Sequence, residues 1–412
     1  MNLKEKVFAP KFFDCLKGYN SGIATADLMA GIVVGIVAIP LAIAFGIASG
    51  VGPAEGLITA IIAGFFIAVL GGSKVQIGGP TGAFIVIVYG IIQQHGLAGL
   101  MIATIMAGVI LVLLGVFKLG SIIKFVPYPV TVGFTGGIAI TIFSTQMNDF
   151  FGLGIEKVPA DFIHKWICYI ENFSHVNWWA FGVAAVSLLI IIFSPKISKK
   201  VPGSLLAIII ATIAVYFIKG SVDNTGIKTI GDLYEMPEGF PAPRFPAFEL
   251  AEEQTWLSVV QSLFPAAFTI AMLGAIESLL SAIVADGVIG DKHNSNTELI
   301  GQGVANIVVP FFGGIPATGA IARTAANIKN GGRSPIAGMT NINNGGKTPV
   351  AGVVHCVILT LVLLFLGDLV KLIPMPCLAA VLVMVSYNMS GWKTFVSLSK
   401  SPKSDFAVLM TT

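Results

Sequence analysis

Charged residues are scarce in this sequence. Asp, Glu, Lys and Arg together make up 11% of the 412 residues, against roughly one quarter in soluble domains. Hydrophobic residues make up 55%, and the formal net charge is only +3. This composition excludes an ordinary soluble protein and predicts an integral membrane protein in contact with lipid. Because the basic residues are spread over the chain rather than gathered in one patch, we expect no nucleic-acid partner.

The sequence also lacks the patterns of a metal site or an enzyme. Its four cysteines, Cys15, Cys168, Cys356 and Cys377, are scattered, with no CxxC pair and no histidine at ligand spacing. The histidines stand apart from one another, and neither a Walker loop nor a nucleophile–base motif is present. We therefore expect no catalytic residue, no metal site and no cofactor other than a coupling ion, and no enzymatic activity.

Long apolar runs recur along the whole chain, and most reach the roughly 20 residues that a helix needs to cross a bilayer. The runs predict spans at about 27–49, 53–70, 97–119, 129–151, 178–193, 205–219, 256–284, 296–312, 349–366 and 377–387. Residues 1–20 are basic and polar and show no cleavage site, so we expect a cytoplasmic segment before a retained first span. The protein is then a multi-pass protein of the cell membrane, in bacteria the inner membrane.

Two further regions shape the expected topology. Residues 221–255 are rich in Pro, Gly and acids, which predicts an extracellular loop, argues against a helix and leaves a short strand open. The last apolar run, from Phe406 to Met410, is too short to cross a bilayer, so we expect the chain to be truncated in its thirteenth span.

The most informative stretches are two Gly/Pro-rich segments that interrupt the apolar pattern. Residues 78–84 read GGPTGAF, and residues 314–335 read GIPATGAIARTAANIKNGGRSP. The apolar run after the first segment ends at about Ile92, too early for a full crossing, which predicts a half-helix. Paired interrupted segments of this kind point to a binding site at the membrane midplane. Helix N-termini attract negative charge, so the expected ligand is an anion.

Two charges accompany these segments inside apolar sequence, where charge is costly and indicates function. Glu277 lies in mid-span and is expected to face a cavity, a partner or a bound cation. If protonated it would couple transport to H⁺, and if ionised it could hold Na⁺ or pair with Arg323. Arg323 could attract the anion or offset Glu277, and the sequence leaves both roles open.

A tandem repeat follows the second segment. NIKNGGRSPIAGMT at 327–340 is followed directly by NINNGGKTPVAGVV at 341–354, with the same spacing of Gly, basic residue and Pro. We interpret the repeat as a tolerated loop insertion. The alternative is a modified cytoplasmic gate.

At these residues the chain resembles the sulfate permease (SulP) family of anion transporters. The matching pieces are DLMAGIVVGIVAIPLAIAFGIASG at 27–50, GPTGAF at 79–84, FVPYPVTVGFTGGIAI at 125–140, IGDLYEMPEGFPAPRFPAF at 230–248 and the block 273–335. The resemblance implies an all-α polytopic membrane protein with two inverted repeats of seven spans. It also implies a core domain, a gate domain, elevator-type movement and, at full length, a homodimer. Family members continue with two more spans and a STAS domain.

The resemblance also implies how the chain divides and where the ligand lies. The expected parts are an N-terminal segment (1–20), core-domain spans (21–120), gate-domain spans (121–220), the loop (221–255), further core-domain spans (256–370) and an incomplete gate domain (371–412). The implied substrate-binding residues are Thr81, Gly82, Ala83, Ala320, Ile321, Ala322 and Arg323, with Glu277 for the coupling ion.

The predicted function is secondary active transport of small, sulfate-like inorganic anions, as a symport coupled to H⁺ or Na⁺, with lipid as the surrounding partner. Three alternatives stay open. The first is a Na⁺-coupled bicarbonate transporter of the same family, the second is a nucleobase–cation symporter of related fold, and the third is an anion channel.

Overall fold

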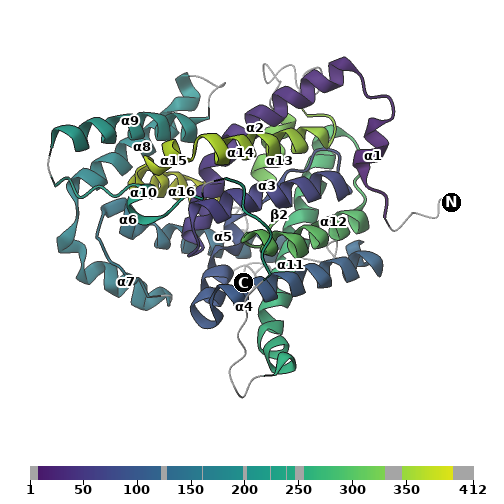
Figure 1. The fold of residues 1–412 in the computed structure, drawn as a ribbon, viewed down its shortest axis with the longest axis horizontal. Coiled ribbons are helices and arrows are strands. Elements are labelled where there is room, and N and C mark those ends of the chain that lie inside the picture. The colour runs from purple at the N-terminus through teal and green to yellow at the C-terminus, as the bar shows by residue number, and fades with distance from the viewer. Residues whose placement is uncertain are drawn as a thin grey trace. The chain divides into compact units, whose positions relative to one another are not determined.

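The computed structural model describes residues 8–121, 128–159, 161–197, 202–222, 224–237, 239–245, 255–329 and 346–392 (Figure 1). The chain divides into two compact, helical units. Unit 1 comprises Met1–Ala42, Ala54–Lys124 and Gly239–Leu364, and unit 2 comprises Ile43–Pro53, Phe125–Glu238 and Phe365–Thr412. Each unit is therefore assembled from segments that are far apart in the sequence.

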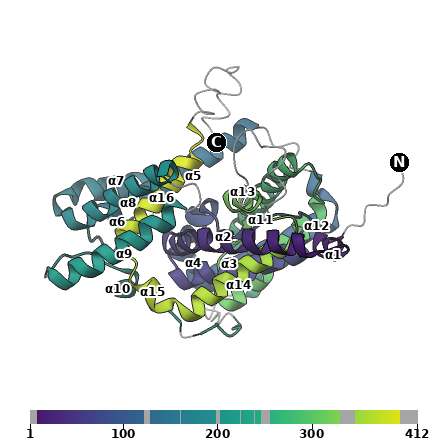
Figure 2. The ribbon, with the colours of Figure 1, turned by 90° about the horizontal axis from the view of Figure 1, so that it is seen from above.

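Unit 1 contains most of the long apolar helices. Its elements are α1 (Lys11–Leu16), most of α2 (Ser21–Ala48), α3 (Pro53–Leu70), β1 (Gly78–Gly79), η1 (Gly82–Phe84), α4 (Ile85–Val116), α11 (Trp256–Ile289), α12 (Ser295–Val308), η4 (Val309–Phe312), β2 (Thr318–Gly319), α13 (Ile321–Lys329) and α14 (Val350–Phe365). Helix α14 packs on α2 at Gly31, where a Cβ would lie 2.6 Å from the Ala351 carbonyl oxygen (Figure 2). It also contacts α3, because the Cys356 thiol lies 3.9 Å from the Ala60 carbonyl oxygen.

Helix α12 crosses α4 at a pair of glycines. A Cβ on Gly303 would lie 2.6 Å from the Gly108 carbonyl oxygen, and a Cβ on Gly108 would lie 2.6 Å from the Gly303 carbonyl oxygen. Backbone atoms therefore meet directly, which only residues without side chains allow. This close crossing places α12 deep within unit 1, where Thr297, Glu298, Gln302 and Asn306 are buried.

Unit 2 has a different interior, built from aromatic and small apolar side chains. Its helices are α5 (Tyr128–Thr145), α6 (Met147–Phe151), α7 (Phe162–Glu171), η3 (Phe173–His175), α8 (Trp178–Ile197), α9 (Gly203–Ser221), α10 (Ile230–Leu233), α15 (Gly367–Lys371) and α16 (Met375–Met389). Phe150 and Ala184 are buried against Ala379 and Ala380. The ring of Phe151, beside this cluster, stacks on Phe181 with 5.5 Å between centroids.

The lengths of the helices agree with a membrane-spanning protein. Among the described residues, six helices are long and apolar enough to cross a bilayer: Ser21–Ala48, Pro53–Leu70, Gly82–Val116, Trp178–Lys196, Gly203–Ser221 and Trp256–Ile289. Two shorter apolar helices, Val350–Phe365 and Met375–Met389, lie where the sequence predicts spans. The other predicted spans, 129–151 and 296–312, correspond to α5 with α6 and to α12 with η4.

The predicted half-helix after residue 80 is part of a longer kinked helix. Helix α4 runs from Ile85 to Val116, but Gly96 inside it has φ 66 and ψ −174, which no helix adopts. The first segment therefore ends next to Gln93, Gln94 and His95, as predicted, and the following span begins directly after the kink. Glycine suits this position because the kink requires a positive φ, which residues with a side chain rarely adopt.

The loop 221–255 differs from expectation. The density of Pro argues against a helix, yet Ile230–Leu233 forms a helical turn, α10. Thr229 and Asp232 close this turn as a capping box, and the Lys219 ammonium donates to the Asp232 carboxylate over 2.7 Å. Thr229 also forms a β-bridge with Pro374. A capping box outweighs the proline signal here because prolines follow the turn rather than lying inside it.

The tandem repeat lies largely outside the described residues, as do Phe406 to Met410, so both interpretations stay predictions. At its borders, the Gly346 amide donates to the Asn327 carbonyl oxygen over 3.0 Å. The buried Asp27 carboxylate accepts bonds from the backbone amides of Lys347 (2.7 Å) and Thr348 (3.1 Å) and from the Tyr19 hydroxyl (3.1 Å). Asp27 thereby caps the start of α14.

Candidate functional site

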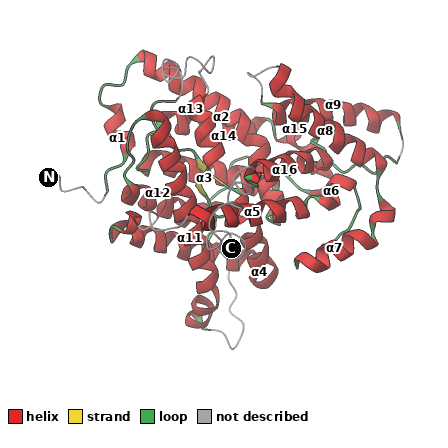
Figure 3. Cartoon of the chain, turned by 180° about the vertical axis from the view of Figure 1, so that it is seen from behind, coloured by secondary structure: helices red, strands yellow, loops and turns green. Residues whose placement is uncertain are grey.

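The two Gly/Pro-rich segments meet in unit 1 as short extended arms. We call residues 71–81 the first arm and residues 313–320 the second arm. Gly78 pairs with Gly319 and Gly79 with Thr318 in an antiparallel ladder, the only sheet in the described residues (Figure 3). The Ala320 amide extends the pairing by donating to the Ile77 carbonyl oxygen over 2.8 Å. Because each arm leads into a helix, two helix N-termini start on opposite sides of one crossing point.

Glycine is required where the arms touch. Gly79 has φ +146, which side-chain-bearing residues rarely adopt, and a Cβ there would collide with the guanidinium of Arg323. Gly78 and Gly319 also leave room for buried side chains, because a Cβ on Gly78 would collide with Ile67 and a Cβ on Gly319 with Gln76. These close approaches are the local reason why an apolar chain carries glycine at these positions.

Hydroxyl groups on α11 and α13 form hydrogen bonds with the two arms where the arms cross. Ser278 Oγ accepts a hydrogen bond from the Gly319 amide (3.1 Å) and lies 2.5 Å from Thr318 Oγ1. Thr324 Oγ1 accepts a hydrogen bond from the Ile77 amide over 3.1 Å. These side chains replace hydrogen bonds that extended backbone cannot make with lipid. These hydroxyl groups are not among the predicted site residues, although serine and threonine within apolar helices are a usable signal.

Arg323 joins the two arms. Its side chain is 1% exposed, and its guanidinium donates to the carbonyl oxygens of Gly78 and Pro80 on the first arm. The arginine belongs to α13, which follows the second arm, so one side chain links both half-helix starts. Bonds to carbonyl groups leave its positive charge uncancelled, and a buried charge acts over a long range in low dielectric.

Glu277 binds a hydroxyl group rather than a cationic side chain. Its Oε2 accepts a hydrogen bond from Thr81 Oγ1 over 2.9 Å. Although Arg323 is near enough for electrostatic attraction, no ion pair within 4.0 Å joins Glu277 and Arg323 among the described residues. The direct pairing that the sequence left open is therefore not formed. Glu277 and Thr81 instead connect α11 to the first half-helix.

The remaining predicted residues line the two helix starts. Gly82 and Ala83 are buried in η1, and Ala320 is 7% exposed just before α13. Ile321 and Ala322 begin α13 and are both exposed. The first amides of a helix have no intrahelical acceptor, so those of Ile321 and Ala322 are available as donors. All eight predicted residues thus lie in one region of unit 1.

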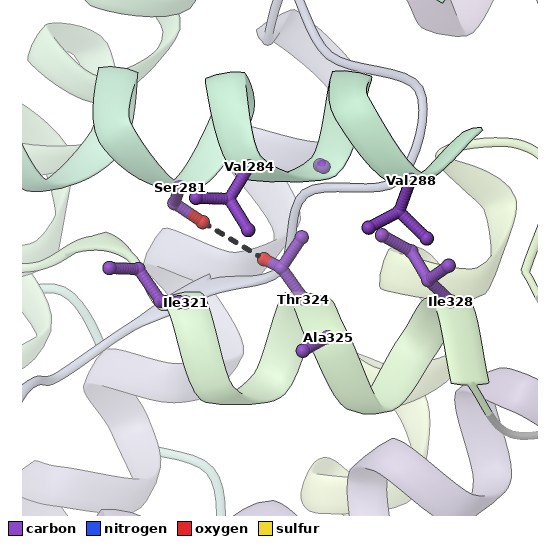
Figure 4. A pocket seen from close by; sticks show the side chains of 8 residues that line it. Ser281, Val284, Val288, Ile321, Thr324, Ala325 and Ile328 are labelled. Atoms are coloured by element: carbon purple, nitrogen blue, oxygen red, sulfur yellow. Dashed lines mark hydrogen bonds between the residues drawn. The ribbon is translucent and has the colours of Figure 1, made fainter. Parts of the chain in front are cut away.

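A cavity between α11 and α13 lies beside this region but has different chemistry. It is lined by Ser281, Val284, Ala285, Val288, Ile321, Thr324, Ala325 and Ile328 (Figure 4). Its only two polar side chains bind each other, since the Ser281 hydroxyl donates to Thr324 Oγ1 over 3.3 Å. An aliphatic cavity of this kind suits no anion.

An ion pair holds the beginning of the first arm, outside the spanning helices. The Lys74 ammonium lies 2.6 Å from the Asp291 carboxylate. The hydrogen bond from Lys74 lowers the pKa of Asp291, and the same bond raises the pKa of Lys74. Both side chains are partly exposed, so the pair contributes little to stability.

Comparison with known proteins gives the family. The model of the sulfate permease family matches residues 25–340 and 338–412, two matches that overlap inside the tandem repeat. YvdB of Bacillus subtilis is 47% identical over 404 residues, which cover 98% of this chain and 71% of the relative. The chain belongs to the sulfate permease family. The bicarbonate transporter BicA of Synechocystis is 32% identical over 346 residues, 82% of this chain and 56% of BicA.

Solved structures of similar proteins show the sulfate permease fold. The transmembrane domain of a cyanobacterial bicarbonate transporter BicA superposes with a TM-score of 0.80 at 31% identity, covering 94% of this chain and 93% of that domain. SLC26A9 gives a TM-score of 0.80 at 19% identity, covering 96% of this chain and 63% of that protein. The predicted fold class, a polytopic helical membrane protein with seven-plus-seven inverted repeats, is confirmed.

Proposed function

We propose that this sulfate permease family member is a secondary active transporter that binds small inorganic anions between its two half-helix starts. The observation that carries the proposal is the antiparallel crossing of the arms, which brings two helix N-termini and the buried Arg323 together. Helix dipoles, free amides and a guanidinium all favour negative charge. In a low-dielectric surrounding these effects add up to a site for an anion and not for a neutral nucleobase.

The proposed ligand contacts are backbone donors more than side chains. Thr81, Gly82 and Ala83 would face the anion from the first half-helix, and Ala320, Ile321 and Ala322 from the second. Arg323 would act through its charge, because its guanidinium already donates to two carbonyl groups. A site of this kind fits sulfate and bicarbonate alike.

Sulfate is our first candidate substrate, because YvdB is named for sulfate transport and shares 47% identity. Bicarbonate is the second candidate, because the BicA transmembrane domain shares the fold across 94% of this chain. Elevator-type movement is supported by the location of every proposed contact, since all of them belong to unit 1. Such a unit could carry its ligand as one body. We further propose that the full-length protein is a homodimer.

Uptake into proteoliposomes tests the proposal. We expect the purified full-length protein to accumulate radiolabelled sulfate against its gradient when a Na⁺ or H⁺ gradient is imposed, and labelled bicarbonate identifies the second candidate. Anion flux that only follows the membrane potential, without accumulation, would show a channel. Accumulation of labelled uracil in place of both anions would show a nucleobase symporter.

Glu277 is the proposed coupling residue, as the acceptor of the Thr81 hydroxyl at the first half-helix. A proton or Na⁺ bound by Glu277 would alter this hydrogen bond and thereby the start of the half-helix. Glu277→Gln should abolish the dependence of uptake on the cation gradient, because the amide side chain neither titrates nor holds Na⁺ well. The matched control is Glu156→Gln, at an exposed position of unit 2. Unchanged gradient dependence in Glu277→Gln would rule out the coupling role.

A further inference from the structure

Helix α12 carries three buried polar side chains on one face. Glu298, Gln302 and Asn306 are spaced four residues apart and are 0%, 0% and 1% exposed, and this spacing places them one above the other along the helix. Glu298 Oε1 accepts from Gln302 Nε2 over 2.9 Å, and Asn306 Nδ2 donates to the Gln302 carbonyl oxygen over 2.8 Å. We call these three side chains the polar ladder.

One end of the polar ladder binds the first arm. Glu298 Oε2 accepts hydrogen bonds from the amides of Gly72 (2.8 Å) and Ser73 (3.1 Å), where the arm leaves α3. The Asn294 amide, just before α12, donates to the Gly72 carbonyl oxygen over 3.0 Å. The turn at the start of the first arm is therefore bound to α12 and the residue before it through two backbone amides and one carbonyl oxygen.

The other end of the polar ladder binds the second arm. Asn306 Nδ2 donates to the Ala317 carbonyl oxygen (2.8 Å), and Asn306 Oδ1 accepts from the Ala317 amide (2.9 Å). Asn306 thus pairs with Ala317 as a neighbouring strand would. Ala317 directly precedes β2, so this pairing sets where Thr318 and Gly319 meet the first arm.

We propose that the polar ladder of α12 positions the two half-helix starts relative to each other, and that Asn306 and Glu298 are positioning residues of the anion site. Neither side chain needs to touch the anion. The inference rests on the proposed function for its transport measurement, but its structural measurement needs no substrate.

The chemistry of the ladder distinguishes conservative from disruptive variants. Asn306→Asp keeps the size but removes both hydrogen-bond donors, and it places a carboxylate against the carbonyl oxygens of Ala317 and Gln302. Glu298→Gln keeps an oxygen for the amides of Gly72 and Ser73. When the Gln302 amide turns over, the new amide group can donate to Gln302 Oε1, which is buried without a partner in the described part of the chain. Glu298→Gln should therefore disturb the arms much less than Glu298→Ala.

Unit 2 offers a matched control. Asn148 pairs with both backbone groups of Ile155, donating over 3.0 Å and accepting over 3.1 Å. Asn148→Asp makes the same chemical change to the same kind of pairing, away from the arms.

Two measurements on the full-length protein in lipid nanodiscs and proteoliposomes test the proposal. Hydrogen–deuterium exchange reports the amides of Gly319 and Ala320 through a peptide covering 313–324. In Asn306→Asp their exchange should accelerate about tenfold, as expected when buried partners are lost. The KM for sulfate should rise by about the same factor, with a smaller change in kcat. Glu298→Ala should accelerate exchange at Ile77 on the first arm, whereas Asn148→Asp should leave peptide 313–324 and the KM unchanged.

Several results would overturn the proposal. Unchanged exchange in 313–324 for Asn306→Asp would do so, as would equal acceleration throughout α4 and α11, which indicates general loss of stability. If Asn306→Asp cannot be recovered folded, equal effects of Glu298→Gln and Glu298→Ala would refute the ladder's role. If exchange responds as expected but the full-length wild-type protein moves no sulfate, the positioning role stands and the proposed substrate is wrong.

Discussion

The two units bury different chemistry. Unit 1 encloses a large set of polar and charged side chains, among them Asp27, Gln76, Ser278, Glu298, Gln302, Asn306, Thr318, Arg323, Thr324 and Asn327. Among the described residues, unit 2 buries fewer polar side chains, including Gln146, Lys165 and Ser187. One of its apolar clusters packs Phe150, Phe151 and Phe181 on small residues of α8 and α16. Both units belong to one membrane protein, so lipid exposure does not explain the contrast.

The contrast follows from the backbone. Unit 1 contains two extended arms at which the chain leaves helical hydrogen bonding, and lipid cannot satisfy the freed amides and carbonyls. Hydroxyl, amide, carboxylate and guanidinium groups take those places. Continuous helices satisfy most backbone groups of unit 2 internally, so aromatic packing suffices there. Several buried polar side chains of unit 1 therefore bind the irregular backbone of the arms, at the candidate site.

The largest expected effect comes from removing the buried cation of unit 1. Arg323→Ala leaves the carbonyls of Gly78 and Pro80 without donors and removes the positive charge beside the half-helices. We expect about 3 kcal/mol less unfolding free energy and an approximately hundredfold loss of sulfate uptake at low concentration. Thermal unfolding in detergent measures the loss of stability, and uptake in proteoliposomes measures the loss of transport. Lys165, buried in unit 2, provides the control. If Lys165→Ala impairs uptake as strongly, the contrast between the units is wrong.

Replacing glycine by alanine should lower the free energy of unfolding at a position in unit 1 and raise it at a position in unit 2. A Cβ at Gly303 of α12 would lie 2.6 Å from the Gly108 carbonyl oxygen, so Gly303→Ala must push two helices apart. We expect a loss of about 1 to 3 kcal/mol in unfolding free energy. Gly182, inside α8 of unit 2, has no atom within 4 Å of the position that a Cβ would occupy, so Gly182→Ala should stabilise by about 0.5 to 1 kcal/mol. Melting temperatures of the two variants that shift in the same direction would contradict this expectation.

The smallest expected effect concerns surface charge. Lys74 lowers the pKa of Asp291, so the pair stabilises the folded state above the unfolded-chain pKa of about 3.9. That stabilisation is lost as pH falls through the lower, folded-state pKa. Asp291→Asn should cost about 0.5 kcal/mol at neutral pH and nothing in strong acid. Chemical denaturation across pH measures this. In unit 2, Asp368→Asn at the more exposed pair with Lys371 should change nothing measurable.

Much of the fold could be predicted because apolar run length and glycine–proline breaks are local signals. The spans, the break after His95 and the two arms all follow from short windows of sequence. The helical turn α10 is not predicted, because the density of proline in residues 221–255 argues against a helix. In the structure the capping box of Thr229 and Asp232 nevertheless forms the turn.

The partners within the candidate site could not be predicted in the same way. Thr81 and Glu277 are 196 residues apart, and Glu298 and Gly72 are 226 residues apart. No periodicity in the sequence says which buried donor meets which acceptor over such distances. The spacing of Glu298, Gln302 and Asn306 on one helix face was a visible signal, but only the arms give it a meaning. The roles of the predicted ligand residues stay predictions until binding is measured.

Asp27 has a consequence for how the protein is made. Its carboxylate belongs to the first spanning helix, yet the Lys347 amide that it binds comes 320 residues later. A ribosome needs on the order of tens of seconds to synthesise that length. During this time only the Tyr19 hydroxyl, among the partners named above, is available to the carboxylate, and a carboxylate with so few partners resists burial in lipid. We therefore expect stable membrane insertion of the first helix to depend on the synthesis of α14.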